Sequence, residues 1–349
     1  MQPRADGLEK TQAKLKKLLE LFDRKANLLI FMQDHPDPDA VASAAALRRL
    51  ANSANLTCSM VCGGMVGRAE NRALIDYLGL NLRTIDEVAP AAFDLVGLVD
   101  TQPQTGNNPL PPGVEPHLVI DHHPIHKATR GVDFTDIRSG YGATATIMCE
   151  YIQAAGIAPE IPLATALLYG IRSDTQDLGR QARKPDFDAH YFLYHYANLK
   201  MLAQIQHGPL RHDYYQLLFN ALRHARRLDH AVFTHLGRVE NPDMPGEIAD
   251  LLVRHEDVQW CLCTGVVRDS LLLSLRARDV NRDAGALMHH LVAPRGTGGG
   301  HNRLAGGQIQ LPSASAEAIA EIENWVYARF RAALHIRHKR SRTLLKDAQ

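Results

Sequence analysis

The sequence contains short apolar runs that each end in acidic or imidazole side chains. The first run, LLIFMQ at residues 28–33, is followed directly by DHPDPDA at residues 34–40. Two further runs, FDLVGLVD at 93–100 and PHLVIDHH at 116–123, end in the same way. Short continuous apolar runs are typical of strands that are buried on both faces, as in a parallel sheet. The prolines of DHPDPDA cannot donate ladder hydrogen bonds, so the first strand is expected to end there.

Helical patterns alternate with these predicted strands in the first half of the chain. The pattern predicts a strand at 56–63 and helices at 8–25, 40–54, 68–79 and 142–155. A helix or mixed segment is predicted at 161–179. Because strands that alternate with helices form βαβ units, the expected architecture is an α/β domain with a mostly parallel sheet flanked by helices.

The second half of the chain has a different pattern. Residues 210–229 read as one long helix, and strands are predicted at 230–239, 257–267 and 269–279. A glycine cluster at 296–307 and a C-terminal helix follow. These elements predict a smaller C-terminal α/β domain.

The chain length of 349 residues suggests two domains. We predict a catalytic domain at 1–205, a helical linker at 206–228, and a substrate-binding domain with a basic C-terminal tail at 229–349. The basic tail could attract nucleic-acid phosphates, but a solvated helix end explains it equally well.

Composition excludes several classes of protein. Lys and Arg total 39 and Asp and Glu total 38, so a net charge of +1 excludes a basic nucleic-acid coat protein. The sequence lacks an apolar run long enough to span a membrane, so no membrane partner is expected. The five cysteines are scattered in apolar contexts, which favours a reduced, cytoplasmic protein without a disulfide framework.

The acidic and imidazole groups that follow the apolar runs are the candidate functional residues. The carboxyl ends of parallel strands meet at one edge of a sheet, where ligands bind. We count the apolar segment at 167–175 as a fourth strand end, which delivers Asp174. A single such Asp, for example Asp39, is usually only a helix cap. Several carboxylates gathered together need a positive partner, and a mixed Asp and His set suits Mn²⁺.

These motifs resemble the DHH phosphoesterase superfamily. DHPDPDA, Asp100, IDHH at 120–123 and Asp174 occur in the order of the family's four motifs. GGGHNRLAGG at 298–307, preceded by SLRARD at 274–279, is similar to the DHH-associated C-terminal domain. The family includes RecJ-like exonucleases, nanoRNases that also dephosphorylate 3′-phosphoadenosine 5′-phosphate, and cyclic di-AMP phosphodiesterases. The resemblance covers roughly residues 25–310.

The resemblance implies a role for each residue that matches a motif. Asp37 would bind a first metal ion, Asp39 a second, and Asp100 would bridge both. His122 and Asp174 would also ligate the second ion. Asp121 would orient His122, and His123 would face the substrate phosphate, so the implied catalytic residues are Asp100, His122 and His123.

Gln33 departs from the family pattern. The family's first motif begins with His, and the matching position here is Gln33. A neutral amide is a poorer ligand than imidazole, so the first metal ion would bind loosely or be a harder ion such as Mg²⁺. His35 lies two residues away and could compensate from beside the site.

The glycine cluster is the candidate substrate-binding element. Successive glycines let backbone N–H groups approach an anion, although a glycine run by itself usually marks only a turn. By resemblance, the nucleotide or its phosphate would be held by Arg276, Gly299, Gly300 and His301, with Arg303 as a further donor.

The expected chemistry is hydrolysis by water that two divalent ions activate. Such ions, roughly 3.5–4 Å apart, lower the pKa of a shared water and neutralise charge on the phosphoryl group. We expect Mn²⁺, with Mg²⁺ as the alternative, and a short oligonucleotide or small nucleotide as substrate, because no further domain is left to track a long strand. A homodimer is compatible with the sequence.

Two other functions remain open from the sequence. One is a phosphodiesterase of cyclic di-AMP or a linear dinucleotide, which uses the same chemistry on another substrate. The other is a nucleotide-binding sensor whose catalysis has weakened, which is suggested by Gln33 in the place of the family His.

Overall fold

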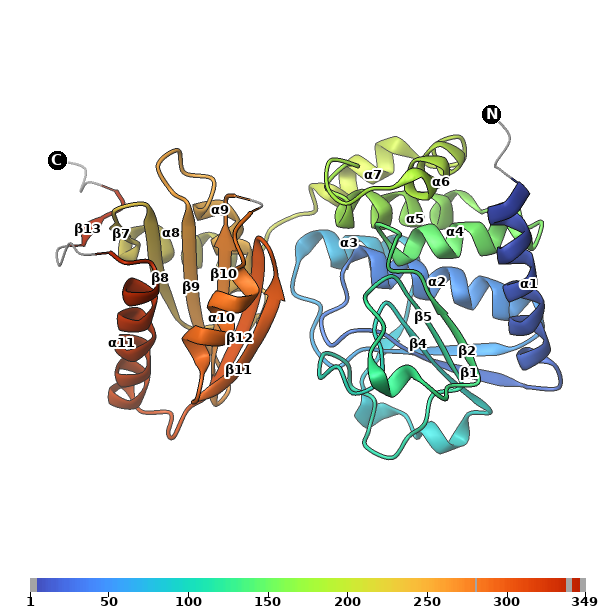
Figure 1. Cartoon of the computed structure of the whole chain (residues 1–349), viewed down its shortest axis with the longest axis horizontal. Helices are drawn as coiled ribbons and strands as arrows, with labels where there is room; N and C mark the ends of the chain where they lie inside the picture. The colour runs from blue at the N-terminus through green and yellow to red at the C-terminus, as the bar shows by residue number, and fades with distance from the viewer. Residues whose placement is uncertain (1–4, 280, 337–340, 346–349) are drawn as a thin grey trace. The chain divides into compact units, whose positions relative to one another are not determined.

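The chain folds into two compact units, Met1–Gly208 and Pro209–Gln349. The computed structural model describes residues 5–279, 281–336 and 341–345. Figure 1 shows that each unit has its own sheet and its own helices. None of the helices in these described ranges is both long enough and apolar enough to cross a bilayer.

The N-terminal unit contains a six-stranded parallel sheet with the order β3-β2-β1-β4-β5-β6. Its strands are β1 (Asn27–Phe31), β2 (Thr57–Val61), β3 (Leu82–Arg83), β4 (Leu95–Val99), β5 (Leu118–Asp121) and β6 (Phe134–Ile137). The side chains of β4 and β5 are buried on both faces, which explains their continuous apolar sequences. The predicted parallel α/β fold is therefore confirmed. Two strands were not predicted: β3 has only two residues, and β6 is only half buried, so it lacks a continuous apolar run.

Helices of this unit cover the sheet. They are α1 (Ala5–Phe22), α2 (Pro38–Ser53), α3 (Ala69–Tyr77), α4 (Thr144–Ala154), α5 (Ile161–Asp174), α6 (Lys184–Tyr194) and α7 (Leu199–Gln206). The alanine-rich α2 is buried on almost every side, and it packs against both α4 and α5. A Cβ at Gly170 of α5 would lie 3.1 Å from Cα of Asp39, so this glycine lets α5 approach the start of α2 closely.

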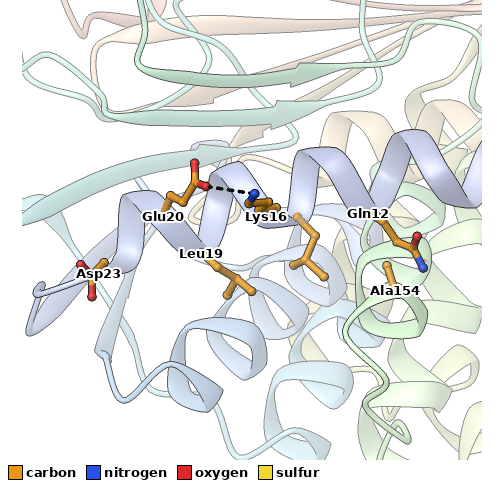
Figure 2. A pocket seen from close by; sticks show the side chains of 7 residues that line it. Gln12, Lys16, Leu19, Glu20, Asp23 and Ala154 are labelled. Atoms are coloured by element: carbon orange, nitrogen blue, oxygen red, sulfur yellow. Dashed lines mark ion pairs between the residues drawn. The ribbon is translucent and has the colours of Figure 1, made fainter.

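The N-terminal helix α1 borders a surface pocket on the same unit. Figure 2 shows this pocket, which Gln12, Leu15 and Leu19 line together with Ala154 of α4. Lys16 and Glu20 form an ion pair of 4.0 Å across one turn of the helix there. Both charges are exposed, so the pair contributes little to stability.

The C-terminal unit contains a mixed seven-stranded sheet with the order β11-β12-β10-β9-β8-β7-β13. Its strands are β7 (Arg226–Leu228), β8 (Ala231–Arg238), β9 (Trp260–Val267), β10 (Ser270–Ala277), β11 (Gly296–His301), β12 (Leu304–Gln310) and β13 (Arg342–Thr343). Only β8 and β9 pair in parallel among these strands. This smaller α/β domain agrees with the fold class predicted from the sequence.

Helices cover both faces of the second sheet. One core contains residues of α10 (Ala284–Val292) and α11 (Ala316–Ala333), and another contains residues of α8 (His212–His224) and α9 (Met244–Leu252). Cys261 and Cys263 are buried in the second core, where burial raises the pKa of both thiols. All five cysteines are free, as the sequence predicts.

Three local predictions need correction. The predicted helix at 210–229 ends at His224, and the chain then enters β7. The glycine cluster at 296–307, where no strand was predicted, forms the antiparallel hairpin of β11 and β12. The segment that delivers Asp174 is the end of a helix, α5, and not a strand. A short apolar run cannot by itself distinguish a strand from a buried helix.

Candidate metal centre

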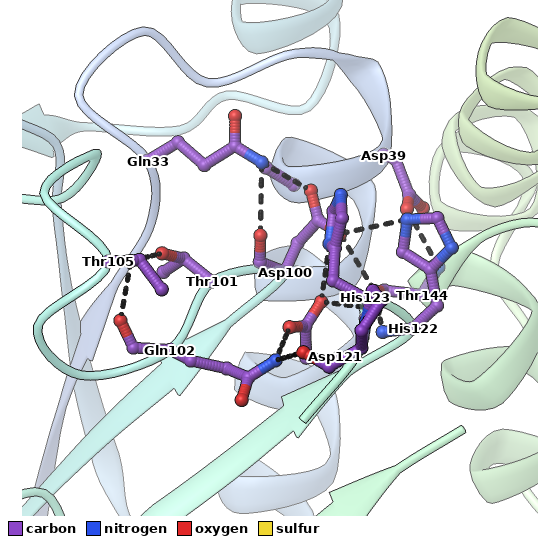
Figure 3. A network of polar contacts seen from close by, with 12 residues as sticks. Gln33, Asp39, Asp100, Thr101, Gln102, Thr105, Asp121, His122, His123 and Thr144 are labelled. Carbon is purple, nitrogen blue, oxygen red and sulfur yellow. Dashed lines mark hydrogen bonds and ion pairs between the residues drawn. The ribbon is translucent and has the colours of Figure 1, made fainter. Parts of the chain in front are cut away.

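The candidate site lies at the carboxyl ends of β1, β4 and β5, which are neighbours in the first sheet. Gln33 follows β1 by two residues, Asp100 follows β4 directly, and Asp121 is the last residue of β5. Because these strands are parallel, all three side chains belong to the same edge. Figure 3 shows them together with His122 and His123.

Two acidic residues at the start of α2 enter this site. Asp37 is the N-cap of α2, and its Oδ1 accepts a hydrogen bond of 2.9 Å from the Ala40 N–H. Asp39 is fully buried in the first turn, and its carboxylate accepts hydrogen bonds from the N–H groups of Thr144 (2.7 Å) and Ala145 (2.6 Å). The start of α4 is therefore fixed to the start of α2 through Asp39.

Asp100 occupies the centre of the polar network. Its φ of +59° lies in the left-handed region, which is uncommon for a residue with a side chain and typical of functional sites. Asp100 Oδ1 accepts a hydrogen bond of 2.8 Å from Thr144 Oγ1, and Oδ2 accepts one of 2.9 Å from Gln33 Nε2. The carboxylate is 1% exposed, so it requires such partners.

The ring of His122 is held by the backbone. Its Nδ1 lies 3.2 Å from the carbonyl oxygen of Tyr141, which can only accept a hydrogen bond, so Nδ1 carries a proton and Nε2 is the nitrogen left for a cation. Nε2 lies 3.3 Å from Asp174 Oδ2 and 3.6 Å from Asp100 Oδ1. This buried nitrogen lacks a hydrogen-bond partner among the described residues. A buried nitrogen directed at two carboxylates is the arrangement of a metal ligand.

His123 and Asp121 form a second pair at the same edge. Asp121 Oδ1 lies 2.8 Å from His123 Nδ1, and Asp121 Oδ2 accepts a hydrogen bond of 2.6 Å from Gln102 Nε2. Burial alone would raise the pKa of Asp121, but the hydrogen bonds from His123 and Gln102 outweigh it and lower that pKa. Asp121 thus orients His123 in this structure, whereas the resemblance implied that it orients His122.

The structure identifies two groups of side chains that could each hold a metal ion. One group is Asp39, His122 and Asp174, and the other is Asp100, His122 and His123. In each group the ligand atoms lie within 4.8 Å of one another. Carboxylate oxygen and imidazole nitrogen together suit a divalent ion such as Mn²⁺ or Mg²⁺, so the residues present fit the metal that the motifs imply.

The carboxylates of the site are poorly compatible with one another without a cation. Burial, followed by repulsion from Asp174, raises the pKa of Asp37 to about 6 and that of Asp39 to about 7. Burial and the charges of Asp39 and Asp37 raise the pKa of Asp100 well above its ordinary value. A divalent ion bound among these carboxylates would stabilise their charged forms and so counteract the rise in their pKa values.

His35 does not join either group of side chains. It is exposed, and its Nδ1 lies 3.4 Å from the carbonyl oxygen of Met65. Asp34 beside it has a pKa that burial raises. Compensation for Gln33 by His35 remains a prediction.

The predicted substrate-binding residues lie in the C-terminal unit. The Arg276 side chain is 11% exposed; it forms an ion pair with Asp250 and donates to Ser274 Oγ (2.7 Å). Arg303 Nε donates to the carbonyl oxygen of Ala277 (3.2 Å). Gly300 pairs with Ala305 in the hairpin. The side chain of His301 lies outside the described residues.

Gly299 faces open space in the same hairpin. A Cβ added to Gly299 would meet no atom within 4 Å. Gly299 pairs with Gly306, whose own added Cβ would meet only a carbonyl oxygen at 4.0 Å. The hairpin therefore has a face without side chains at this pair, which is open to a flat ligand.

Sequence reasoning missed the residues that hold the site together. Gln102 and Thr144 bond directly to its carboxylates, and Asp186 fixes the loop before α4 by accepting from the Gly142 N–H (2.9 Å). Their sequence neighbourhoods carry no distinctive motif. Only the position of Thr144 near the start of a predicted helix could have suggested a capping role.

Comparisons with known proteins agree with these observations. The model described as "DHH family, N-terminal domain" matches residues 27–171, and the model described as "DHHA1 domain" matches residues 230–328. An uncharacterised protein of Methanocaldococcus jannaschii is 31% identical over 293 residues, which are 83% of this chain. The chain spans 59% of the length of that relative.

One of the aligned solved structures shares the fold of the chain at low sequence identity. An exopolyphosphatase-related protein from Bacteroides fragilis aligns with a TM-score of 0.68 and 14% identity, over 92% of this chain and 97% of its own. RecJ from Thermus thermophilus, solved in complex with Mg²⁺, aligns with a TM-score of 0.45 and 14% identity, over 93% of this chain and 52% of its own. The two matched domains and their motifs establish that this chain belongs to the DHH family, with a DHHA1 domain after its DHH domain.

Proposed function

We propose that the chain is a metal-dependent phosphoesterase that hydrolyses short oligonucleotides or removes phosphate from 3′-phosphoadenosine 5′-phosphate. The observation that carries this proposal is the buried Nε2 of His122, which faces the carboxylates of Asp100 and Asp174 without a hydrogen bond. Membership of the DHH family supports the reaction class. The choice of a nucleotide substrate comes from the resemblance of the glycine-rich hairpin.

The residues that would hold divalent metal are Asp39, Asp100, His122 and Asp174, with His123 adjacent. When bound there, a divalent cation would lower the pKa of a water molecule and neutralise charge on a phosphoryl oxygen. The chain contributes rigidity, because Asp39, Asp100 and the two histidines each have a further partner in the protein. Thr144, for example, bonds to both Asp39 and Asp100.

His123 is placed to contact the substrate phosphate. Its side chain is 37% exposed, whereas that of His122 is 13% exposed, so His123 is the imidazole that faces solvent. Burial alone would lower the pKa of His123, but the hydrogen bond and the charge of Asp121 raise it, which favours the imidazolium form that can donate to a phosphoryl oxygen. Nothing in this arrangement requires a covalent intermediate with Ser or Cys.

Hydrolysis of di- to pentanucleotides, with Mn²⁺ and with a chelator, tests the proposal. The expected result is metal-dependent release of mononucleotides, which Asp100→Asn reduces by about 10² or more, as is typical when a group that stabilises transition-state charge is lost. The matched control is Asp94→Asn, an exposed Asp whose carboxylate accepts from the Ala26 N–H and whose own N–H donates to the Asn27 side chain. Absence of any metal-dependent product from these oligonucleotides and from 3′-phosphoadenosine 5′-phosphate would overturn the proposal.

A substrate panel separates this reading from a dinucleotide phosphodiesterase. The panel compares cyclic di-AMP, its linear product and 3′-phosphoadenosine 5′-phosphate at equal concentration. We expect kcat/KM to be higher for 3′-phosphoadenosine 5′-phosphate than for cyclic di-AMP or its linear product. A preference for cyclic di-AMP or its linear product would instead identify the alternative function.

A further inference from the structure

Gln33 makes contacts that a metal ligand at its position would not make. Its Nε2 donates to Asp100 Oδ2 (2.9 Å) and to the main-chain oxygen of Asp100 (3.0 Å). Figure 3 shows the amide nitrogen directed at Asp100 and the amide oxygen directed away from it. The Gln33 side chain therefore offers N–H groups to the carboxylate, where an imidazole would offer a lone pair to a cation.

The backbone on both sides of Gln33 is fixed. The N–H of Met32 donates to the carbonyl oxygen of Val61 (2.9 Å), and the N–H of Asp34 donates to that of Asn107 (2.8 Å). The position of Gln33 over Asp100 is thus set by the β1–β2 pairing and by the loop after β4. Rotating the amide to present its oxygen to a cation would break both hydrogen bonds to Asp100.

The two oxygens of Asp100 have different surroundings. Oδ1 lies near Thr144 Oγ1 (2.8 Å), His122 Nε2 (3.6 Å) and His123 Nδ1 (3.8 Å). Oδ2 accepts the N–H of Gln33. A cation bound to Oδ2 would meet the positive end of that N–H dipole. Oδ1 also accepts one hydrogen bond, from Thr144, but it is the oxygen that faces the imidazoles of His122 and His123. The Oδ1 side of Asp100 is therefore the side on which a cation would find further ligands.

The two candidate ligand groups share His122, and this ring can bind one ion only. Its Nδ1 is committed to the carbonyl oxygen of Tyr141, so Nε2 is the single nitrogen available. Asp37 belongs to neither group of the described residues, and its Oδ1 caps α2. The two groups thus meet at His122 Nε2, which lies 3.3 Å from Asp174 Oδ2 and 3.6 Å from Asp100 Oδ1.

From these contacts we infer that the chain holds one resident divalent cation, bound by Asp39, Asp100, His122 and Asp174, and that the Gln33 amide replaces a second cation at Asp100 Oδ2. The inference rests on the proposed function, since it specifies the metal centre of that reaction. It differs from the expectation of two ions that the motif resemblance implies. The neutral N–H donor satisfies the buried oxygen but supplies no positive charge.

Metal stoichiometry tests this inference without any substrate. Chelator-treated protein is titrated with Mn²⁺ by calorimetry, and bound metal is counted by elemental analysis after desalting. Wild type is expected to bind one equivalent, and Gln33→His two. In Gln33→Leu the substituted side chain can neither donate a hydrogen bond nor bind a metal ion. This variant is expected to keep one equivalent of Mn²⁺. Gln12→His, which adds an exposed imidazole on α1 beside the pocket of Figure 2, is the matched control and should also bind one.

Electron paramagnetic resonance supplies a second readout. An exchange-coupled Mn²⁺ spectrum requires two ions about 3.5–4 Å apart, so it is expected for Gln33→His and not for wild type. Two equivalents with a coupled spectrum in wild type would overturn the inference. Loss of the single ion in Gln33→Leu, with an unchanged melting temperature, would show that Gln33 is itself a ligand and would overturn it too.

These outcomes are distinguishable from failure of the proposed function. One bound ion without hydrolysis of any nucleotide would refute the proposed function and leave the metal count intact. Hydrolysis by a protein with two coupled ions would support the function and refute the single-cation centre. If Gln33→His binds two ions but does not gain activity, the single-cation inference is still supported, because the metal stoichiometry is measured without substrate.

Discussion

Asp39 and Thr144, which are far apart in the sequence, are joined by a hydrogen bond of 2.7 Å from the Thr144 N–H to Asp39 Oδ2. The hydroxyl of the same threonine donates to Asp100 Oδ1 (2.8 Å) and accepts from the His122 N–H (3.2 Å). Thr144 is fully buried, and through its backbone N–H and its hydroxyl this one residue links the start of α4 to three candidate ligands. The geometry of the metal centre therefore depends on a residue that binds no metal itself.

Replacing the Thr144 hydroxyl should weaken both the fold and the metal centre. Thr144→Val removes the donor to Asp100 and the acceptor for His122, and it leaves buried polar groups unsatisfied. We expect a loss of about 1–3 kcal/mol in the free energy of unfolding, measured by urea denaturation in chelator. Thr144→Ser keeps the hydroxyl and should lose less. Equal stability of Thr144→Val and wild type would contradict the proposed linking role.

The metal-free protein should become less stable as the pH rises. The pKa of Asp37 is raised from 3.8 to about 6 and that of Asp39 to about 7, chiefly by burial and by Asp174. A group whose pKa is higher in the folded state binds more protons there, so the free energy of unfolding falls as the pH rises between the two values. The loss therefore occurs between pH 3.8 and about 7.

His122 extends this trend to higher pH. Burial alone would lower its pKa, but Asp174 and Asp39 outweigh burial and raise it from 6.5 to about 10. Its contribution to stability is complete below pH 6.5 and is lost as the pH rises towards about 10. The two aspartates and His122 thus all make the metal-free protein less stable as the pH rises.

Thermal melts in chelator, at several pH values, check this prediction. The melting temperature should fall between about pH 5 and about pH 8, and saturating Mn²⁺ should raise it most at the higher pH. Asp39→Asn removes one of the titrating groups, so its melting temperature should change less over the same interval. A wild-type melting temperature that rises with pH in chelator would refute the pKa assignments.

Asp186 should contribute strongly to the stability of the fold but should take no part in metal binding. Its buried carboxylate accepts from the N–H groups of Gly142 (2.9 Å) and Arg183 (2.7 Å) and from Thr146 Oγ1 (2.6 Å). Asp186→Ala leaves these donors without an acceptor, and we expect a loss of about 3 kcal/mol or more. Asp188→Ala, on the same helix but half-exposed, should cost at most about 0.5 kcal/mol.

Urea denaturation compares these two variants, and Mn²⁺ titration follows on the folded fraction. Asp186→Ala should still bind the metal with the wild-type stoichiometry wherever it folds. Similar losses of stability for Asp186→Ala and Asp188→Ala would show that the buried carboxylate is not the anchor of the loop before α4.

Glycines on the two faces of the β11–β12 hairpin should respond differently to alanine. A Cβ at Gly307 would lie 2.6 Å from Met288 Sδ and 2.9 Å from Val292 Cγ1, so Gly307→Ala must displace α10 and should cost about 1–3 kcal/mol. Gly299→Ala meets open space and should keep wild-type stability.

Nucleotide binding separates the roles of these glycines further. If a nucleotide lies against the open face at Gly299, the added methyl group of Gly299→Ala should raise KM with little change in kcat. Steady-state kinetics and thermal melts on both variants provide the measurement. An unchanged KM for Gly299→Ala would place the substrate elsewhere.

The sequence determined the architecture of the first unit and the candidate residues of the site. The apolar residues 95–99 are buried on both faces, and this pattern alone predicts a parallel sheet. Parallel strands must present Asp100 and the DHH residues at the same edge. Patterns of this kind are local, so they can be read along the chain.

The tertiary structure decided which groups contact one another. The helical end of α5 brings Asp174 to His122, and the start of α4 brings Thr144 to Asp39. Gln33 looked from the sequence like a weakened ligand, whereas its contacts are those of a donor to Asp100. Hydrogen-bond direction and distance depend on the packing of segments remote in sequence, and residue spacing along the chain does not encode them.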